Sequence, residues 1–355
     1  MQAAITSRLP MGVAEITGDW VTSALQERYP GVEVTSLQQN GTLGGTATKV
    51  LLQLEYNAMG DAIGLPPSLY AKGGFEWHKV SFVNSFRAEG RFYRDWAPRF
   101  HANIPKGFYG GWNDEQGIAL IENLDLRGGV SYGGSDPNPL PVDLVFKVVG
   151  LLAEIHASFW DDPEVMTLRT LGERVGTNFI DYMLVPSYWA QCCSEPRGST
   201  IPKAFHDTDR VFKGLQAMWA MVDDGPQTFC HGDPHQGNLF FEADGTPGYL
   251  DFQAYIHSSS LHDVNYFIVG SLSVEDRQKH ARDLLKFYLS ELQRRGVKNV
   301  WSFDEAWERF RRHTMHGLLW FTTPPEMQPM EVVTAHGIRF GAAAQDYQTA
   351  EALGV

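Results

Sequence analysis

The sequence predicts an α+β fold of two lobes, a small β-rich N-terminal lobe and a larger, mostly helical C-terminal lobe. The chain has 355 residues, whereas a single hydrophobic core stops growing at roughly 250–300 residues. Short strand-like segments gather before Leu124, and helical periodicity prevails after it. We therefore expect an N-terminal domain over 1–123 and a C-terminal domain over 124–355.

The elements expected in the N-terminal lobe alternate between helices and strands. A first helix begins at a Thr17 cap and ends before Pro30-Gly31, and a second is stopped by Pro98. Apolar segments bounded by Gly and Pro residues are typical of strands. The sequence predicts helices over 17–29 and 78–96, and strands over 32–37, 49–56, 68–72, 107–112 and 118–121.

The C-terminal lobe follows a connector rich in Gly and Pro over 127–141. A helix is expected over 143–160, because apolar residues recur there at helical spacing. Two short apolar runs, 239–241 and 248–250, are separated by a strong turn signal and predict a hairpin.

Composition narrows the class of protein. The net charge of -13 argues against a nucleic-acid binder, which needs a basic face for phosphates. Three cysteines are too few for a disulfide framework, which favours a reducing compartment. The first residues lack a signal peptide's apolar core, and no run is long enough to span a bilayer. We expect a cytoplasmic protein.

The segment His231-Gly-Asp233-Pro-His235-Gln-Gly-Asn238 predicts phosphoryl transfer from a nucleotide. Asp233 and Asn238 have the spacing of a D-x-x-x-x-N catalytic loop, and Asp251 follows after the hairpin. Such chemistry needs one carboxylate for the proton of the attacking hydroxyl, and an amide and a second carboxylate for magnesium. Asp233 is the candidate base, and Asn238 and Asp251 are the candidate metal ligands.

A symmetric hairpin register would pair Asn238 with Asp251. Directly opposed residues lie on one face of a sheet, with Cβ atoms roughly 4.5–5.5 Å apart. One Mg²⁺ ion, which prefers few protein ligands, could then bind both side chains. A slip of one residue would send them to opposite faces.

Lys72 and Glu89 form a second candidate pair. Glu89 falls on the apolar stripe of the helix expected over 78–96, and a buried carboxylate needs a partner. No basic residue stands three or four positions away, so the partner must come from elsewhere in the fold. Lys72, at the end of the preceding strand, is the natural candidate, as in the Lys–Glu pair that positions nucleotide phosphates.

The loop between the first two strands contains Gly41, Gly44, Gly45 and Thr46. It does not match G-x-G-x-x-G, so the signal is weak by itself. Exposed backbone amides near glycine can nevertheless bind phosphate. Because the loop precedes the strand that ends in Lys72, we expect Gly44, Gly45 and Thr46 to contact a nucleotide.

These motifs together resemble the aminoglycoside phosphotransferase and choline kinase superfamily. The resemblance rests on the His231–Asn238 segment, on Leu250-Asp-Phe-Gln253, and on His262-Asp263-Val-Asn-Tyr-Phe267. The runs Glu89-Gly-Arg-Phe92-Tyr93 and Pro66-Pro-Ser-Leu-Tyr-Ala-Lys72 are similar to the ecdysteroid kinase-like branch.

The resemblance implies a bilobal protein-kinase-like fold that uses ATP and Mg²⁺ to phosphorylate a hydroxyl of a small molecule. The N-terminal lobe would then bind the nucleotide, and the C-terminal lobe would supply catalytic and substrate-binding residues. It also implies that Asp263 braces the catalytic loop. Gln253 stands where D-F-G has Gly and no A-P-E run follows, which argues against protein substrates.

We expect a mostly apolar alcohol, steroid-like or polyketide-like, as the substrate. Aromatic and Met residues over 301–330 are suited to an apolar pocket. An aminoglycoside or amino alcohol is the alternative substrate. Two other classes stay open: a dinuclear metal hydrolase built on His231, Asp233, His235, His257, His262 and Asp263, and a kinase-like binding protein without catalysis.

Overall fold

The computed structural model describes residues 8–76, 82–134, 136–178, 180–222 and 224–355. The chain forms two compact units. Unit 1 contains the chain up to Phe100, Ile104–Val130 and Leu250–Ala254, and unit 2 contains His101–Asn103, Ser131–Tyr249 and Tyr255–Val355. Unit 1 is built on a sheet and unit 2 is mostly helical, which confirms the predicted fold class. The predicted boundary at residue 123 lies inside unit 1.

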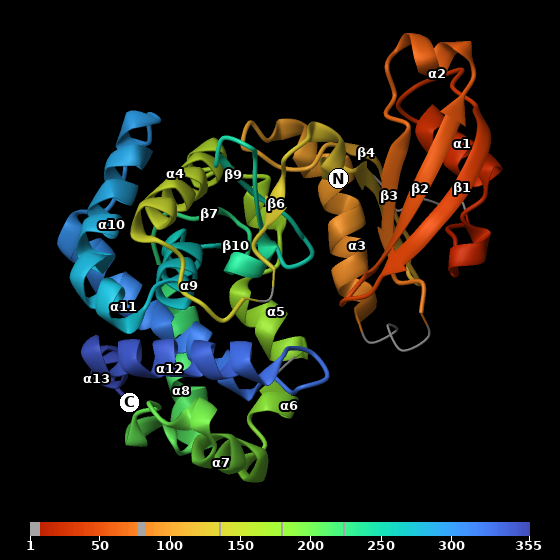
Figure 1. Ribbon diagram of the computed structural model, residues 1–355. Helices are drawn as coiled ribbons and strands as arrows, with labels where there is room; N and C mark the ends of the chain where they lie inside the picture. The colour runs from red at the N-terminus through yellow and green to blue at the C-terminus, as the bar shows by residue number, and fades with distance from the viewer. Residues whose placement is uncertain (1–7, 77–81, 135, 179, 223) are drawn as a thin grey trace. The chain divides into compact units, whose positions relative to one another are not determined.

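Unit 1 contains a five-stranded antiparallel sheet in the order β1-β2-β3-β5-β4 (Figure 1). The strands are β1 (Val34–Leu43), β2 (Thr48–Tyr56), β3 (Ser68–Gly73), β4 (Gly107–Trp112) and β5 (Gly117–Glu122). All five predicted strands are therefore present. Residues of β2 alternate between buried and partly exposed, as expected for a sheet with one face in the core.

Three α-helices of unit 1 accompany the sheet: α1 (Gly18–Gln26), α2 (Ala58–Ala62) and α3 (Val83–Arg91). Thr17 caps α1 by accepting from the Trp20 backbone N–H at 3.2 Å, as predicted. Helix α3 continues as a π-helical turn over Phe92–Trp96, and the predicted start at His78 lies outside the described residues. A Cβ atom at Gly90 would collide with the Gly111 carbonyl oxygen, so only glycine allows α3 this close to β4.

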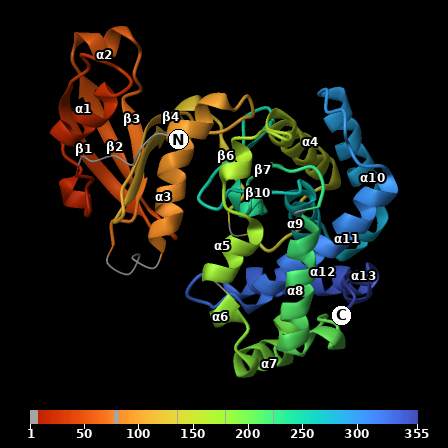
Figure 2. The ribbon, with the colours of Figure 1, turned by 180° about the vertical axis from the view of Figure 1, so that it is seen from behind.

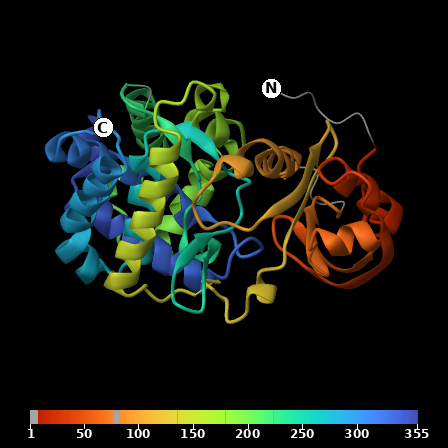
Figure 3. The same ribbon diagram turned by 90° about the horizontal axis from the view of Figure 1, so that it is seen from above.

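Unit 2 is built mainly from helices, which Figures 2 and 3 show from two further directions. Helix α4 covers most of the predicted 143–160 segment. The helices are α4 (Val142–Ser158), α5 (Leu171–Asn178), α6 (Ile180–Met183), α7 (Pro186–Ser194), α8 (Thr208–Val222), α9 (Leu261–Ser271), α10 (Val274–Arg294), α11 (Phe303–Leu319), α12 (Met330–Asp346) and α13 (Thr349–Leu353). Among the described residues, no helix is both long enough and apolar enough to cross a bilayer.

Short strands carry the motif segment of unit 2. Strand β7 (Thr228–Cys230) pairs with β10 (Ile256–Ser258), and β8 (Leu239–Phe241) lies between β6 (Ser131–Tyr132) and β9 (Pro247–Tyr249). The β8–β9 hairpin is thus confirmed, but its predicted register is wrong. Leu239 pairs with Tyr249, and continuing this register would place Leu250, not Asp251, opposite Asn238.

Candidate active site

Lys72 and Glu89 form a buried ion pair in unit 1. Lys72 Nζ lies 2.7 Å from Glu89 Oε1, and the two side chains are 3% and 4% exposed. Strand β3 places Lys72 in the sheet, and α3 turns Glu89 toward it between the buried residues Phe86 and Gly90. The predicted pairing of these two residues is confirmed.

Asp251 is a second partner of Lys72, which the sequence did not reveal. Its Oδ1 lies 3.0 Å from Lys72 Nζ, and its side chain is 22% exposed. The short segment that carries Asp251 is fixed to unit 1 by Phe252, which stacks on Phe92 with ring centroids 4.0 Å apart. We call Lys72, Glu89 and Asp251 the Lys72 group.

The backbone at Asp251 has an unusual conformation. Its φ of 62° lies in the left-handed region, where residues other than glycine are uncommon. Such a conformation persists only where the surrounding structure enforces it, and it concentrates at functional sites. Because Asp251 is not in the extended conformation, the direction of its side chain does not follow the alternation of a strand, on which the predicted pairing with Asn238 depended.

The charges of the Lys72 group are strongly coupled. Burial by itself would lower the pKa of Lys72, but the charges of Asp251 and Glu89 outweigh it and raise that pKa. Burial raises the pKa of Glu89 to about 7, against the opposing effect of Lys72, and the negative charge of Asp251 adds to the rise. One buried cation is therefore shared by two carboxylates, of which Asp251 is the more exposed.

Lys49 is a further cation beside this group. It pairs directly with Lys72 in the antiparallel β2–β3 ladder, so the two side chains share a face of the sheet. Burial lowers the pKa of Lys49, and so does the charge of Lys72. The sequence places Lys49 on a predicted strand next to the strand of Lys72, but only the observed register shows that the two lysines are paired.

The predicted loop residues lie at the tip of the β1–β2 hairpin. Strand β1 extends to Leu43, further than predicted, and Gly44 and Gly45 are exposed while Thr46 is partly buried. Gly41 has a φ of 94°, where the β1–β2 register shifts. The contact of Gly44, Gly45 and Thr46 with a nucleotide stays a prediction.

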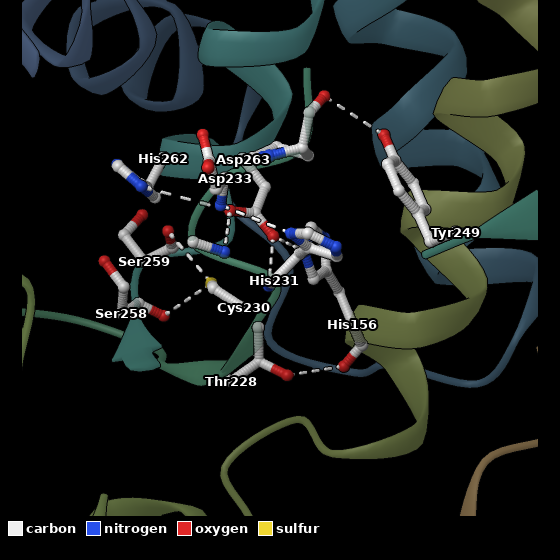
Figure 4. A network of polar contacts seen from close by, with 12 residues as sticks. His156, Thr228, Cys230, His231, Asp233, Tyr249, Ser258, Ser259, His262 and Asp263 are labelled. Atoms are coloured by element: carbon white, nitrogen blue, oxygen red, sulfur yellow. Dashed lines mark hydrogen bonds and ion pairs between the residues drawn. The ribbon is translucent and has the colours of Figure 1, made fainter. Parts of the chain in front are cut away.

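The His231–Asn238 loop of unit 2 is held by Asp263 at the start of α9. Asp263 Oδ2 accepts from the His231 backbone N–H at 2.6 Å, and Oδ1 accepts from the Gly232 backbone N–H at 3.0 Å. Figure 4 shows Asp263 among the residues around this loop. Its expected part as a brace of the loop is confirmed.

Asp263 is itself fully buried and held by an imidazole. His156 Nε2 lies 3.3 Å from Asp263 Oδ2, and His156 Nδ1 lies 2.8 Å from the Tyr288 hydroxyl. Burial by itself would raise the pKa of Asp263, but the hydrogen bond and charge of His156, with the charges of His262 and His231, lower it. Asp263 therefore remains a carboxylate that can accept two backbone hydrogen bonds.

Inside the loop, polar side chains bond to neighbouring backbone. Asn238 Nδ2 donates to the Asp233 carbonyl oxygen at 2.9 Å, which fixes the spacing between the two residues. His235 Nδ1 accepts from the Gly237 backbone N–H at 3.0 Å, so this imidazole caps the short helical turn Gln236–Asn238. The Asp233 carboxylate is 27% exposed, and its Oδ2 lies 3.8 Å from His235 Nε2.

The described residues contain one group of potential metal ligands, His156, Cys230 and Asp263, whose ligand atoms lie within 4.8 Å of one another. Burial raises the pKa of the Cys230 thiol well above its usual range, and Asp263 already binds two backbone amides. Of the six residues considered for a dinuclear hydrolase centre, this group contains only Asp263. The geometry therefore favours a structural brace over a transition-metal centre.

Comparison with known proteins supports a kinase-like enzyme. The model of the ecdysteroid kinase-like family matches residues 163–299, which include the His231–Asn238 loop, Asp251 and Asp263. No curated protein matches the chain.

Distant similarity to solved structures covers most of the chain. An ethanolamine kinase from Plasmodium vivax is 10% identical over 89% of this chain and 83% of its own, with a TM-score of 0.49. A choline kinase from Cryptosporidium parvum is 11% identical over 94% and 95%, with a TM-score of 0.49. A GDP complex of an aminoglycoside 2'-phosphotransferase mutant is 11% identical over 95% and 98%, with a TM-score of 0.42.

The family match and the motif residues that it covers define the class of the protein, a phosphotransferase that acts on a hydroxyl group. The resemblance to the ecdysteroid kinase-like branch, predicted from the sequence, is confirmed by the match over 163–299.

Proposed function

We propose that this chain is an ATP- and Mg²⁺-dependent kinase that transfers the γ-phosphoryl group to the hydroxyl of a small, mostly apolar alcohol. The observation that carries the proposal is the pairing of Lys72 with Glu89 and Asp251, because three residues far apart in the sequence meet through their charges. Such a group is suited to bind phosphates and their metal. A cytoplasmic location also stays a prediction.

Asp233 is the proposed general base. It would accept the proton of the substrate hydroxyl as that oxygen attacks the γ-phosphorus and ADP leaves. Its partly exposed carboxylate suits this role, since a substrate must reach it. Asp263 would act indirectly, because it holds the backbone at His231 and Gly232 and so fixes the position of Asp233.

Asp251, in unit 1, and Asn238, in unit 2, are the proposed ligands of Mg²⁺. The carboxylate of Asp251 and the amide oxygen of Asn238 are the hard oxygen donors that this ion prefers. Asn238 Nδ2 is engaged by the Asp233 carbonyl oxygen, so the amide oxygen is the atom available to a cation. Mg²⁺, when bound, neutralises charge on the phosphates.

Lys72 is the proposed contact of unit 1 to the nucleotide phosphates, with Gly44, Gly45 and Thr46 as backbone contacts. Glu89 positions the ammonium group of Lys72 and does not itself meet the nucleotide. Lys49, beside Lys72 on the neighbouring strand, adds positive charge on the same face of the sheet. Phosphate groups would be favoured by two neighbouring cations.

An uncharged imidazole in unit 2 is compatible with the apolar substrate class. Burial is the main cause that lowers the pKa of His336 to about 4; the charges of Arg339 and His235 lower it further, and the charge of Asp233 opposes them. At neutral pH His336 is therefore uncharged, and it stacks on Phe340 with ring centroids 4.4 Å apart. A polycationic aminoglycoside would favour carboxylates here. The matched family's name, ecdysteroid kinase-like, points to the same class.

Two residues of the 301–330 segment lie in the core or in a separate cavity, and neither is a candidate for a substrate contact. Leu318 is fully buried in the core of unit 2, and Trp307 lines a separate cavity with Arg277 and Arg282. Met327 is 49% exposed and remains a candidate for a substrate contact.

A Mg²⁺-dependent ATP-consumption screen over sterols, other apolar alcohols, amino alcohols and aminoglycosides tests the proposal. We expect turnover of apolar alcohols that requires Mg²⁺ and is lost in Asp251→Ala, with Asp244→Ala in the exposed hairpin turn as control. Turnover of aminoglycosides alone would reject the substrate class and keep the kinase. Mg-ATP affinity that is unchanged in both Asp251→Ala and Asn238→Ala would reject the metal site.

A further inference from the structure

Unit 2 contains a cavity of about 570 Å³ outside the residues discussed so far. Its wall is formed by α10, α11, the last residue of α12 and the two residues that follow it, and it includes no residue of the His231–Asn238 loop. Ligand pockets have volumes of about 300–1,000 Å³. The cavity is therefore large enough for a small organic molecule.

Arg277 in this wall has incomplete hydrogen bonding. It is 1% exposed, its Nη2 lies 2.5 Å from Asp346 Oδ2, and its guanidinium lies 5.0 Å from the Tyr347 ring centroid. Its Nε and Nη1 atoms are buried and have no hydrogen-bond acceptor among the described residues. Because these two atoms have almost no exposed surface, a ligand in the cavity does not reach them, and Arg277 contributes its buried positive charge behind the wall.

Arg282, five residues further along α10, contacts only aromatic rings among the described residues. Its guanidinium lies 4.2 Å from the Trp307 ring centroid and 5.6 Å from that of Phe303. Arg311, by contrast, is engaged by Glu308 and by the Tyr347 carbonyl oxygen. Arg282 is therefore the arginine of the wall whose N–H groups can turn to an incoming anion.

The charge of the wall limits what the anion can be. Asp346 binds Arg277 and Gln278, and Glu308 binds Arg311, so neither carboxylate opposes Arg282 directly. Asp304 is a further exposed carboxylate in the wall. Since the three arginines of the wall (Arg277, Arg282, Arg311) are balanced by three carboxylates (Asp304, Glu308, Asp346), a ligand with one or two negative charges fits better than a polyanion.

A further feature of the wall indicates a ligand with an organic body. The Trp307 and Tyr347 rings meet edge to face, with centroids 5.2 Å apart, and offer an apolar surface beside the arginines.

We propose that this cavity binds a small organic oxyanion, a phosphate monoester or a carboxylate, independently of the active site. The oxygens of the ligand would accept from Arg282, and the buried positive charge of Arg277 would add to the attraction. Its apolar or aromatic body would pack against Trp307 and Tyr347. Guanidinium groups favour such ligands because their N–H groups can donate two parallel hydrogen bonds to the two oxygens of one acid group.

Isothermal titration calorimetry of the full chain with phenyl phosphate, benzoate and inorganic phosphate tests the proposal. Arg282→Gln is the main variant, because this exposed side chain can change without unfolding the helix. Arg294→Gln on the same helix is the matched control, since it pairs with Glu291 and lies outside the wall. Arg277→Gln is the second variant, with a thermal melt to verify folding.

We expect phenyl phosphate or benzoate to bind at one site, with affinity lowered at least about tenfold in Arg282→Gln, as for a lost charge-assisted hydrogen bond. Arg294→Gln should bind as the wild type does, and the tighter probe identifies the acid group. The proposal is overturned if neither organic probe binds or if inorganic phosphate binds as tightly as phenyl phosphate. It is also overturned if Arg282→Gln binds the organic probe as tightly as Arg294→Gln does.

Discussion

The Lys72 group of unit 1 and the His231–Asn238 loop of unit 2 are held in place by different interactions. In the Lys72 group, one buried ammonium is shared by two carboxylates from distant segments. In the loop, Asp263 binds backbone N–H groups, while Asn238 and His235 bond to their own neighbours. The first arrangement depends on charge balance, and the second depends on backbone geometry.

This difference determines how each region should respond to substitution. Removing one partner of a buried charge group leaves an unpaired charge, which is strongly destabilising. Removing a backbone brace leaves an unsatisfied N–H and displaces the side chains that the loop presents. We therefore expect the Lys72 group to dominate the stability of unit 1, and the loop to dominate catalysis.

The largest effect is expected for Asp233→Asn. Loss of the general base should lower kcat by about 10²–10⁴-fold, while Mg-ATP affinity stays close to that of the wild type. Steady-state kinetics on a substrate found in the screen, with calorimetric titration of Mg-ATP, measure both quantities. Near-wild-type turnover would show that Asp233 is not the base.

Lys72→Met should have the next largest effect, on stability. Its loss leaves Glu89 buried without a cation, which typically costs about 3–5 kcal/mol. Glu89→Gln should cost less, because Lys72 keeps Asp251 as a partner. Urea denaturation compares both variants with Lys279→Met, an exposed lysine on α10. Equal stability of Lys72→Met and the control would contradict the charge-balance explanation.

Asp263→Asn should have an intermediate effect on both stability and turnover. An amide has one acceptor oxygen, so either the His231 or the Gly232 backbone N–H loses its partner, at a cost of about 1–3 kcal/mol. Because the loop then shifts, kcat should fall while Mg-ATP affinity changes little. If denaturation and kinetics both match the wild type, Asp263 does not brace the loop.

The last effect concerns the pH dependence of stability, which acts through the Lys72 group. The pKa of Glu89 is raised from its usual value of 4.5 to about 7, so the folded state binds a proton that the unfolded state releases between these values. The stability contributed by this proton is complete below pH 4.5 and is lost as the pH rises through about 7. Denaturation at both ends of this window should show a fall with rising pH that Glu89→Gln removes. An equal fall in the variant would assign it to other groups.

Most of the fold and of the loop could be predicted from the sequence because they depend on local spacing. The strands of unit 1 follow from apolar segments bounded by Gly and Pro, and Thr17 caps its helix through its own side chain. The Asp233–Asn238 spacing has a local reason, since the Asn238 amide bonds the Asp233 carbonyl oxygen. Even the Lys72–Glu89 contact was predictable, because a carboxylate on an apolar stripe needs a cation.

The tertiary structure alone decided the conformation of the segment after the hairpin and the contact that Asp251 makes. The symmetric register misplaced Asp251 by one residue, because the strand ends at Tyr249 and the backbone turns left-handed at Asp251. Stacking of Phe252 on Phe92 then brings this carboxylate to Lys72. Lys49 and the cavity beside Arg277 also depend on strand register and helix packing. Contacts between distant segments leave no periodic signal in the sequence, because their geometry is set by packing and charge and not by spacing along the chain.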